Sequence, residues 1–249
     1  MTPPVGSRDT RPYARELKFL APMADAAGIR AWMRYTLTVD PHGTGTHHDE
    51  YDISTIYFDT NGHDVFNRRG SFGRAKLRIR RYGRSQAAFL ERKLRTDGML
   101  AKRRTPVPLT ELPRLTGPLD ATWPGHWFHK RLLKRALRPS TQMTYHRVAR
   151  SAQHDLGYVR VTMDVDLRVQ PAYGFAFSAE RGAPLSPTHA IVEVKFQGPE
   201  PALLADLCRT FRLAPQSLSK YRLGATALGV VSATPATLDT AAFSIGDPS

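Results

Sequence analysis

Polar and apolar residues alternate along several short stretches of this chain. In the clearest of them, Arg74, Lys76, Arg78 and Arg80 occupy the even positions, and the odd positions between them are apolar. A period of two is typical of a β-strand with one polar face and one buried face. Cations that share one face of a strand repel each other unless an anion lies in front of them. The pattern therefore predicts a strand whose charged face meets an anion.

The same alternation recurs in strands predicted near 13–20, 87–96, 158–169 and 189–197. Their charged faces hold Glu16, Lys18, Glu91, Lys93, Arg160, Asp164, Asp166, Arg168, Glu193 and Lys195. Strands with one ionised face fit poorly into a sandwich, whose inner faces are apolar. They fit a closed barrel with a charged lumen. We therefore expect an α+β fold, a closed antiparallel β-barrel with helices packed outside, whose lumen suits a polyanion and a divalent metal.

The remaining pattern completes one domain over residues 13–231, with a disordered segment at 1–12 and a flexible tail at 232–249. Further strands are predicted at 51–59, 73–82, 99–108, 139–150, and a Pro-rich connection at 106–118. Helices are predicted at 25–35 with Asp25 as N-cap, 63–69, 123–137, 201–211 and 219–230.

The charge and the cysteine content limit the classes of partner and of cellular location that fit the sequence. The formal net charge is +14 with a pI near 10.3, and the segment from Arg68 to Arg104 alone carries fourteen basic and two acidic side chains. An anionic partner follows. A nucleic acid is disfavoured, because the basic strand faces carry few aromatic residues and are interspersed with acids. The single cysteine, Cys208, excludes a disulfide scaffold, and no apolar run suggests a membrane span or signal peptide, so we expect a cytoplasmic protein.

An ordered set of motifs identifies a family. The motifs are Glu16-Leu17-Lys18-Phe19, the segment 51–59, Lys76-Leu77-Arg78-Ile79-Arg80, Phe89-Leu90-Glu91-Arg92-Lys93, Tyr145-His146-Arg147, the segment 160–164, Ile191-Val192-Glu193-Val194-Lys195 and Ser219-Lys220-Tyr221. Over residues 13–225 this order resembles the VTC domain, the polyphosphate polymerase branch of the triphosphate tunnel metalloenzymes. The adenylate cyclase and thiamine triphosphatase branch opens with Glu-x-Glu-x-Lys instead, and Ala14 at its first Glu position disfavours that branch.

The resemblance implies a set of site residues. Phosphate contacts are expected from Lys18, Arg78, Arg80, Lys93, Arg147, Arg160, Lys195, Ser219 and Lys220, and the basic strand at 99–108 adds Lys102. The residues expected to act in catalysis are Arg78, Arg80, Lys93, Glu193 and Lys220. Glu193 is expected to hold Mn²⁺ or Mg²⁺, with Glu16, Glu91 or Asp164 as helpers. A structural role stays open for Glu91 and Glu193, which could instead pair with neighbouring cations and keep a self-repelling tunnel folded.

By resemblance, the protein transfers the γ-phosphate of ATP to a growing polyphosphate chain. Two alternatives stay open: a tunnel triphosphatase that hydrolyses tripolyphosphate or a nucleoside triphosphate, and a non-catalytic sensor of polyphosphate or nucleotide. Synthesis and hydrolysis use the same phosphate clamp and differ only in whether phosphate or water attacks. Because the chain shows no membrane segment, any membrane partner is expected to be a separate protein.

Overall fold

One large antiparallel sheet organises the chain. The computed structural model describes residues 8–9, 14–40, 43–96, 99–154 and 157–231. Eleven strands form the sheet, in the order β1-β7-β6-β5-β4-β8-β9-β11-β2, with β10 paired to β9 and β3 paired to β8. Its members are β1 (Arg8–Asp9), β2 (Ala14–Pro22), β3 (Thr38–Val39), β4 (Glu50–Asp59), β5 (Ala75–Tyr82), β6 (Ala87–Thr96), β7 (Met99–Pro108), β8 (Arg138–His154), β9 (Gly157–Pro171), β10 (Ala183–Pro184) and β11 (His189–Gln197).

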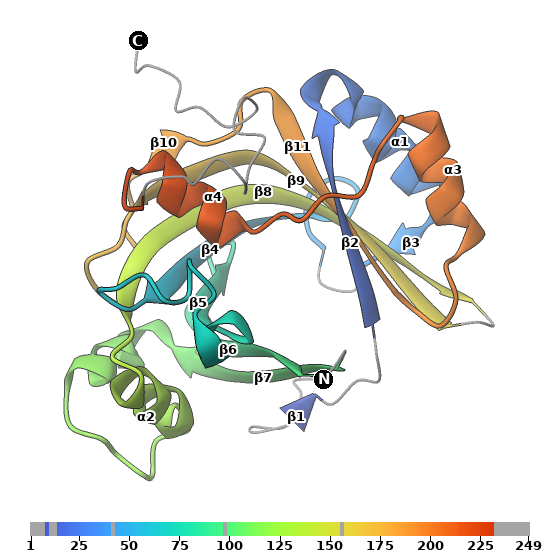
Figure 1. The fold of residues 1–249 in the computed structure, drawn as a ribbon. Coiled ribbons are helices and arrows are strands. Elements are labelled where there is room, and N and C mark those ends of the chain that lie inside the picture. The colour runs from blue at the N-terminus through green and yellow to red at the C-terminus, as the bar shows by residue number, and fades with distance from the viewer. Residues whose placement is uncertain (1–7, 10–13, 41–42, 97–98, 155–156, 232–249) are drawn as a thin grey trace.

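The sheet is curled, so that it has a concave and a convex face (Figure 1). The α+β class is thus confirmed, but the predicted closure is not complete. Among the described residues, no ladder joins β2 to β1 or β7, so the two ends of the strand order are not linked by backbone hydrogen bonds. Arg8–Asp9 pair with β7, which takes them out of the expected disordered segment. The rest of 1–12 and the tail at 232–249 lie outside the described residues.

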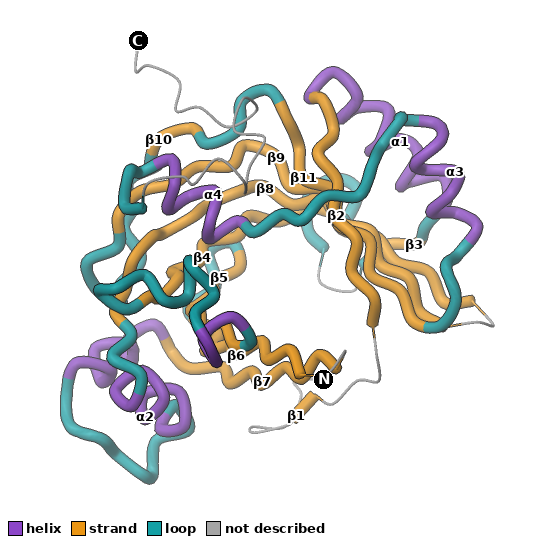
Figure 2. The backbone as a smooth tube through the Cα atoms, viewed as in Figure 1, coloured by secondary structure: helices purple, strands orange, loops and turns teal. Residues whose placement is uncertain are grey.

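Helices cover the convex face in two places (Figure 2). Helices α1 (Ala26–Thr36) and α3 (Ala202–Thr210) share one apolar core with the strands at the β2 end, to which Phe19, Ile29 and Leu207 contribute. Helix α2 (His126–Lys134) packs on a second core together with the 3₁₀ helix η3 (Leu109–Thr116). Two shorter 3₁₀ helices, η1 (Met23–Asp25) and η2 (Gly70–Gly73), precede α1 and β5.

Helix α4 (Lys220–Ala227) departs from the prediction that all helices lie outside, because it packs against the concave face. A Cβ atom built on Gly224 would lie 2.9 Å from Val169 Cγ2 and 3.0 Å from Met143 Cε, so the absence of a side chain permits this close approach. Met143 and Val169 are paired residues of the neighbouring strands β8 and β9, and their side chains lie on the same face of the sheet. Tyr221 donates a hydrogen bond to the carboxylate of Asp59, which fixes the helix to the end of β4. The concave face therefore has a helix over one part of it.

Four other expectations differ from the structure. No helix forms at 63–69, where the Asp59 carboxylate accepts hydrogen bonds from the backbone amides of Val65 and Phe66 and organises consecutive turns instead. The helix predicted at 123–137 is shorter, since Ala136 adopts a left-handed backbone conformation with φ of 47°. The connection at 106–118 contains the 3₁₀ helix η3, and Asp25 precedes α1 without a side-chain cap.

Strand β9 contains an irregularity that the alternation could not reveal. Its register against β8 shifts between Thr144 and His146 of β8, and Asp166, which lies in β9 opposite this point, has a φ of 48°. An inserted residue reverses which face the following side chains occupy. Asp166 is consequently exposed and pairs with Arg168 and Arg181, so Asp166 and Arg168 do not join the concave cluster as predicted.

No helix within the described segments is both long enough and apolar enough to cross a membrane.

Candidate functional site

The strand registers bring the predicted charged residues together on the concave face. Directly paired residues of neighbouring antiparallel strands point to the same side. Lys18 is paired with Glu193, Glu16 with Lys195, and Lys195 in turn with Arg160. Arg147 is paired with Asp164, Arg78 with Glu91, and Lys93 with both Lys76 and Lys102. One face of one sheet thus carries nearly all the side chains that the sequence indicated.

A first group lies where α4 begins. Lys220 Nζ is 2.7 Å from Asp164 Oδ2 and 2.7 Å from Glu193 Oε1. Arg147 donates two hydrogen bonds to Asp164, from Nε at 2.5 Å and from the Nη2 nitrogen at 2.7 Å. All four side chains are buried. Each charged side chain of this group lies beside one of opposite charge, and this pairing offsets the cost of burying it.

The protonation states in this first group follow from the pairing. Burial opposes ionisation of Glu193, but Lys220, Lys18 and Lys195 hold the pKa of its carboxyl far below the usual range. Burial likewise opposes the charge on Lys220, but Asp164 and Glu193 raise the pKa of its ammonium. The carboxylates are therefore charged, and so is the lysine between them.

A second group surrounds Glu16 on β2. The Glu16 carboxylate lies 2.8 Å from Lys93 Nζ, 3.2 Å from Lys18 Nζ and 3.7 Å from Lys195 Nζ. Although burial opposes ionisation, Lys195 and Lys93 hold the pKa of Glu16 well below its usual range. The contact with Lys93 joins β2 to β6, which are far apart in the strand order. Ion pairing therefore spans the gap that backbone hydrogen bonds leave open.

A third group surrounds Glu91 on β6, which is 2% exposed. Its carboxylate lies 2.7 Å from Arg78, 3.2 Å from Arg104 and 3.6 Å from Lys102. Burial again opposes ionisation, and Arg78 with Arg80 holds the pKa of Glu91 well below its usual range. Lys102, which the sequence only suggested, therefore belongs to the cluster.

The last predicted residues lie on the same face but have other partners. Arg80 is 6% exposed and donates to Thr55 Oγ1 and to the hydroxyl of Tyr145. Arg160 donates to Asp40 at 2.7 Å and to the hydroxyl of Tyr51 at 2.9 Å. Ser219, the residue before α4, accepts a hydrogen bond from Lys76 Nζ at 2.9 Å.

Sequence reasoning missed several members of this face and, besides Asp166 and Arg168, wrongly included Arg74. The missed residues are Asp40, Tyr51, Tyr82, Arg104 and Tyr145. Tyr82 has the strand parity of Arg80, and Tyr145 has that of Arg147, so parity could have found both, but their lack of charge hid them. Tyr51 is paired with Arg147 across the sheet. Asp40 follows β3 and has no such signal. Arg74 was expected beside Lys76, but it precedes β5 at the end of η2 and is exposed.

The four carboxylates differ in how well they could bind a metal ion. In the described part of the chain, no group of three or more His, Cys, Asp or Glu side chains is arranged as a metal site. Asp164 and Glu91 have both oxygens engaged by cations. Glu193 Oε2, in contrast, has its nearest ion-pair partner, Lys195, at 3.8 Å. Mg²⁺-type ions bind through one or two carboxylates plus substrate phosphates, and Glu193 fits that requirement best. Glu16 also has both oxygens within 3.2 Å of lysine nitrogens, so it would have to give up one of these pairs to join a metal site.

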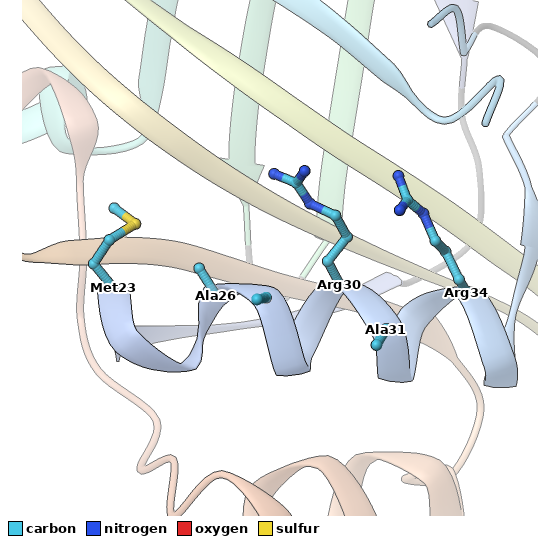
Figure 3. A pocket seen from close by; sticks show the side chains of 6 residues that line it. Met23, Ala26, Arg30, Ala31 and Arg34 are labelled. Atoms are coloured by element: carbon cyan, nitrogen blue, oxygen red, sulfur yellow. The ribbon is translucent and has the colours of Figure 1, made fainter. Parts of the chain in front are cut away.

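A groove along α1 lies on the other side of the sheet (Figure 3). Its lining residues are Met23, Ala26, Ala27, Arg30, Ala31 and Arg34. Arg34 donates to the buried Asp49 at 3.1 Å and to Glu50 at 3.0 Å, and Arg30 lies 3.5 Å from Glu50. Both guanidinium groups are thus already neutralised by acids, so the groove is not the candidate anion site.

An antiparallel sheet curled around cations and carboxylates defines the triphosphate tunnel class of proteins. Within that class the chain belongs to the VTC domain family, whose profile matches residues 13–228. This match confirms the resemblance that the motifs indicated. No curated protein sequence matches.

Solved structures of similar fold share little sequence with this chain. A candidate adenylate cyclase from Bacillus halodurans aligns with a TM-score of 0.48 at 12% identity, over 82% of this chain and 92% of that one. A protein from Pyrococcus horikoshii OT3 aligns with a TM-score of 0.45 at 13% identity, over 84% and 97%. A candidate adenylyl cyclase from Hippeastrum, described as having a dominant triphosphatase activity, aligns with a TM-score of 0.47 at 14% identity, over 86% and 95%.

The opposite directions of Arg80 and Arg81 yield a first prediction. Arg80 faces the cluster, whereas Arg81 is half-buried on the other face and donates to the carbonyl of Ser85. Losing one charge-assisted contact costs about 1.5–3 kcal/mol, so Arg80→Met should weaken tripolyphosphate binding about ten- to a hundredfold. Arg81→Met, the matched control, should change it less than about twofold. Titration calorimetry measures both, and equal losses would show that the face assignment is wrong.

Lys76 yields a second prediction, on stability. Burial, with the nearby Lys18 and Arg68, lowers the pKa of Lys76 to about 7. Between pH 7 and the unfolded pKa near 10.5, the unfolded chain then binds more protons than the folded one, so folding stability should rise with pH in this window. The slope from this group is at most about 1.4 kcal/mol per pH unit.

Denaturant unfolding at several pH values checks this effect, with Lys76→Met removing the contribution. The exposed lysine variant Lys134→Met is the control and should retain the wild-type slope. A Lys76→Met slope equal to that of the wild type would contradict the assignment.

Proposed function

We propose that the concave face binds a nucleoside triphosphate and a polyphosphate chain, and that the protein transfers the γ-phosphoryl group of ATP to the chain. The observation that carries the proposal is the charge balance of this face. Among the described residues, eleven basic side chains face five carboxylates, those of Glu16, Asp40, Glu91, Asp164 and Glu193. The basic residues are Lys18, Lys76, Arg78, Arg80, Lys93, Lys102, Arg104, Arg147, Arg160, Lys195 and Lys220. The excess of positive charge suits a linear polyanion.

The arrangement suits catalysis by positioning. In phosphoryl transfer, a terminal phosphate oxygen attacks the γ-phosphorus in line and ADP leaves, so no enzyme nucleophile is required. Fixed Arg and Lys charges stabilise the equatorial oxygens. The proposed roles are phosphate binding by Lys18, Lys102, Arg147, Arg160, Lys195 and Ser219, and phosphate binding with catalysis by Arg78, Arg80, Lys93 and Lys220.

A divalent cation completes the proposed site. Members of the tunnel family generally use such ions, and we propose Mn²⁺ or Mg²⁺ here. Glu193 is the proposed ligand, with Glu16 as its helper, while Asp164 and Glu91 are proposed mainly to orient Arg147, Lys220 and Arg78. When bound, the ion would neutralise phosphate charge. Lys220 keeps Asp164 as a partner if Glu193 turns toward a metal, so the site can accept the ion without leaving Lys220 unpaired.

We also propose that the protein is cytoplasmic. Its single cysteine is free, which suits a reducing cytoplasm.

Incubation with ATP and Mn²⁺, followed by separation of products by length, tests the proposal and yields the third prediction. Chains longer than three phosphates should accumulate together with ADP. Glu193→Gln should abolish metal-dependent turnover, because it keeps the side-chain shape and removes one negative charge from a hard-cation site. Glu200→Gln, which removes an exposed carboxylate, is the matched control. Orthophosphate as the sole product would favour the triphosphatase, and turnover by Glu193→Gln within a few-fold of wild type would contradict the metal role.

A further inference from the structure

An aromatic row crosses the concave face beside the cations. It consists of Tyr51, Tyr82 and Phe89, and we call these three residues the aromatic row. The centroids of the Tyr51 and Tyr82 rings are 5.7 Å apart at an interplanar angle of 57°, and those of the Tyr82 and Phe89 rings are 5.5 Å apart at 80°. The three residues come from consecutive strands β4, β5 and β6. They form one continuous contact rather than three isolated side chains.

The aromatic row borders the apolar core shared with α2 and η3, to which Tyr51 belongs and against which Tyr82 packs, while Phe89 lies outside both cores. Leu77, Ile79 and Leu90, which alternate with the concave residues of β5 and β6, are already buried in the core shared with α2 and η3. On the concave side, Tyr82 and Phe89 are only half-buried. Tyr57, farther along β4, instead has Tyr221 of α4 against it at 5.6 Å. The row therefore presents apolar surface on the same face that binds phosphate.

Both ends of the aromatic row are tied to cations of the cluster. The Arg104 guanidinium lies 3.5 Å from the centroid of Phe89 and 5.2 Å from that of Tyr82, while its Nε is 3.2 Å from Glu91. At the other end, Arg160 donates to the Tyr51 hydroxyl. The electrostatic potential around the aromatic row is also positive. Burial would raise the pKa of Tyr82, but the nearby positive charge of Arg80 lowers it to about 8.

Inorganic polyphosphate cannot pack against such a row, because it has no apolar or π surface. A nucleobase offers both, and bases stack on aromatic side chains and on guanidinium planes. Tyr82 and Arg80 are two residues apart on the same face of β5, a separation of about 7 Å along the strand. A base on the row and phosphates on Arg80 and Arg104 can therefore belong to one molecule.

We propose that the aromatic row, together with Arg104, is a nucleobase subsite that distinguishes a nucleoside triphosphate from inorganic polyphosphate. The inference rests on the proposed function, since it takes the cation cluster to be the phosphate site. The nucleotide donor would then bind at this part of the concave face, and the remaining cations would bind the growing polyphosphate chain. Stacking tolerates any base, so the subsite selects for a nucleotide rather than for adenine.

Titration calorimetry with adenylyl imidodiphosphate and with tripolyphosphate tests the subsite. Phe89→Leu should weaken binding of the nucleotide about tenfold and binding of tripolyphosphate less than about twofold. Phe89→Tyr should restore nucleotide binding because it keeps the ring. Tyr82→Leu provides a second, independent removal of a ring, and Tyr35→Leu, at a 95% exposed residue of α1, is the matched control and should change neither affinity.

Equal losses for both ligands, or no loss for either, in variants with unchanged circular dichroism would overturn the subsite while the proposed function stands. If the wild type binds tripolyphosphate but not the nucleotide analogue, the subsite is likewise excluded. If it binds neither ligand, the phosphate site itself fails, and the subsite fails with it.

Discussion

Mutual neutralisation of buried ions holds the concave face together. Cations on one face of a sheet repel one another, and burial makes that repulsion stronger because the effective dielectric constant is lower. Glu16, Glu91, Asp164 and Glu193 each lie among two or more of these cations. Breaking one buried pair by removing a partner costs about 3–5 kcal/mol. The carboxylates therefore stabilise the fold whether or not they also bind a metal ion.

This constraint links the fold to the proposed chemistry. The pairs hold Lys and Arg side chains in fixed positions before any substrate arrives, so their reorganisation on binding is small. The same pairs join parts of the chain that backbone hydrogen bonds do not: Glu16 connects β2 to β6, and Lys220 connects α4 to β9 and β11. Since cations exceed carboxylates, the face remains positive after pairing, and a polyanion would complete the neutralisation.

Strand parity carried most of what the sequence could predict. It placed Arg78, Arg80, Lys93 and Lys195 on one face, because β5, β6 and β11 pair without a register shift. It failed at Asp166, where an inserted residue reverses which face of the sheet the following side chains occupy. No residue type in the sequence indicates this insertion. Parity also cannot show the concave position of α4 or the contact of Asp40 with Arg160, since both depend on how distant segments pack.

The central claim is that the concave face is an anion site whose charges are incompletely neutralised in the free protein. The melting temperature at increasing tripolyphosphate concentration, at pH 7 and two salt concentrations, tests it most directly. A ligand that binds only the folded state stabilises that state by mass action. The account predicts a melting temperature that rises through the millimolar range, with a gain that shrinks at higher salt and is smaller with sulfate at equal ionic strength. An unchanged melting temperature at millimolar tripolyphosphate would contradict the claim.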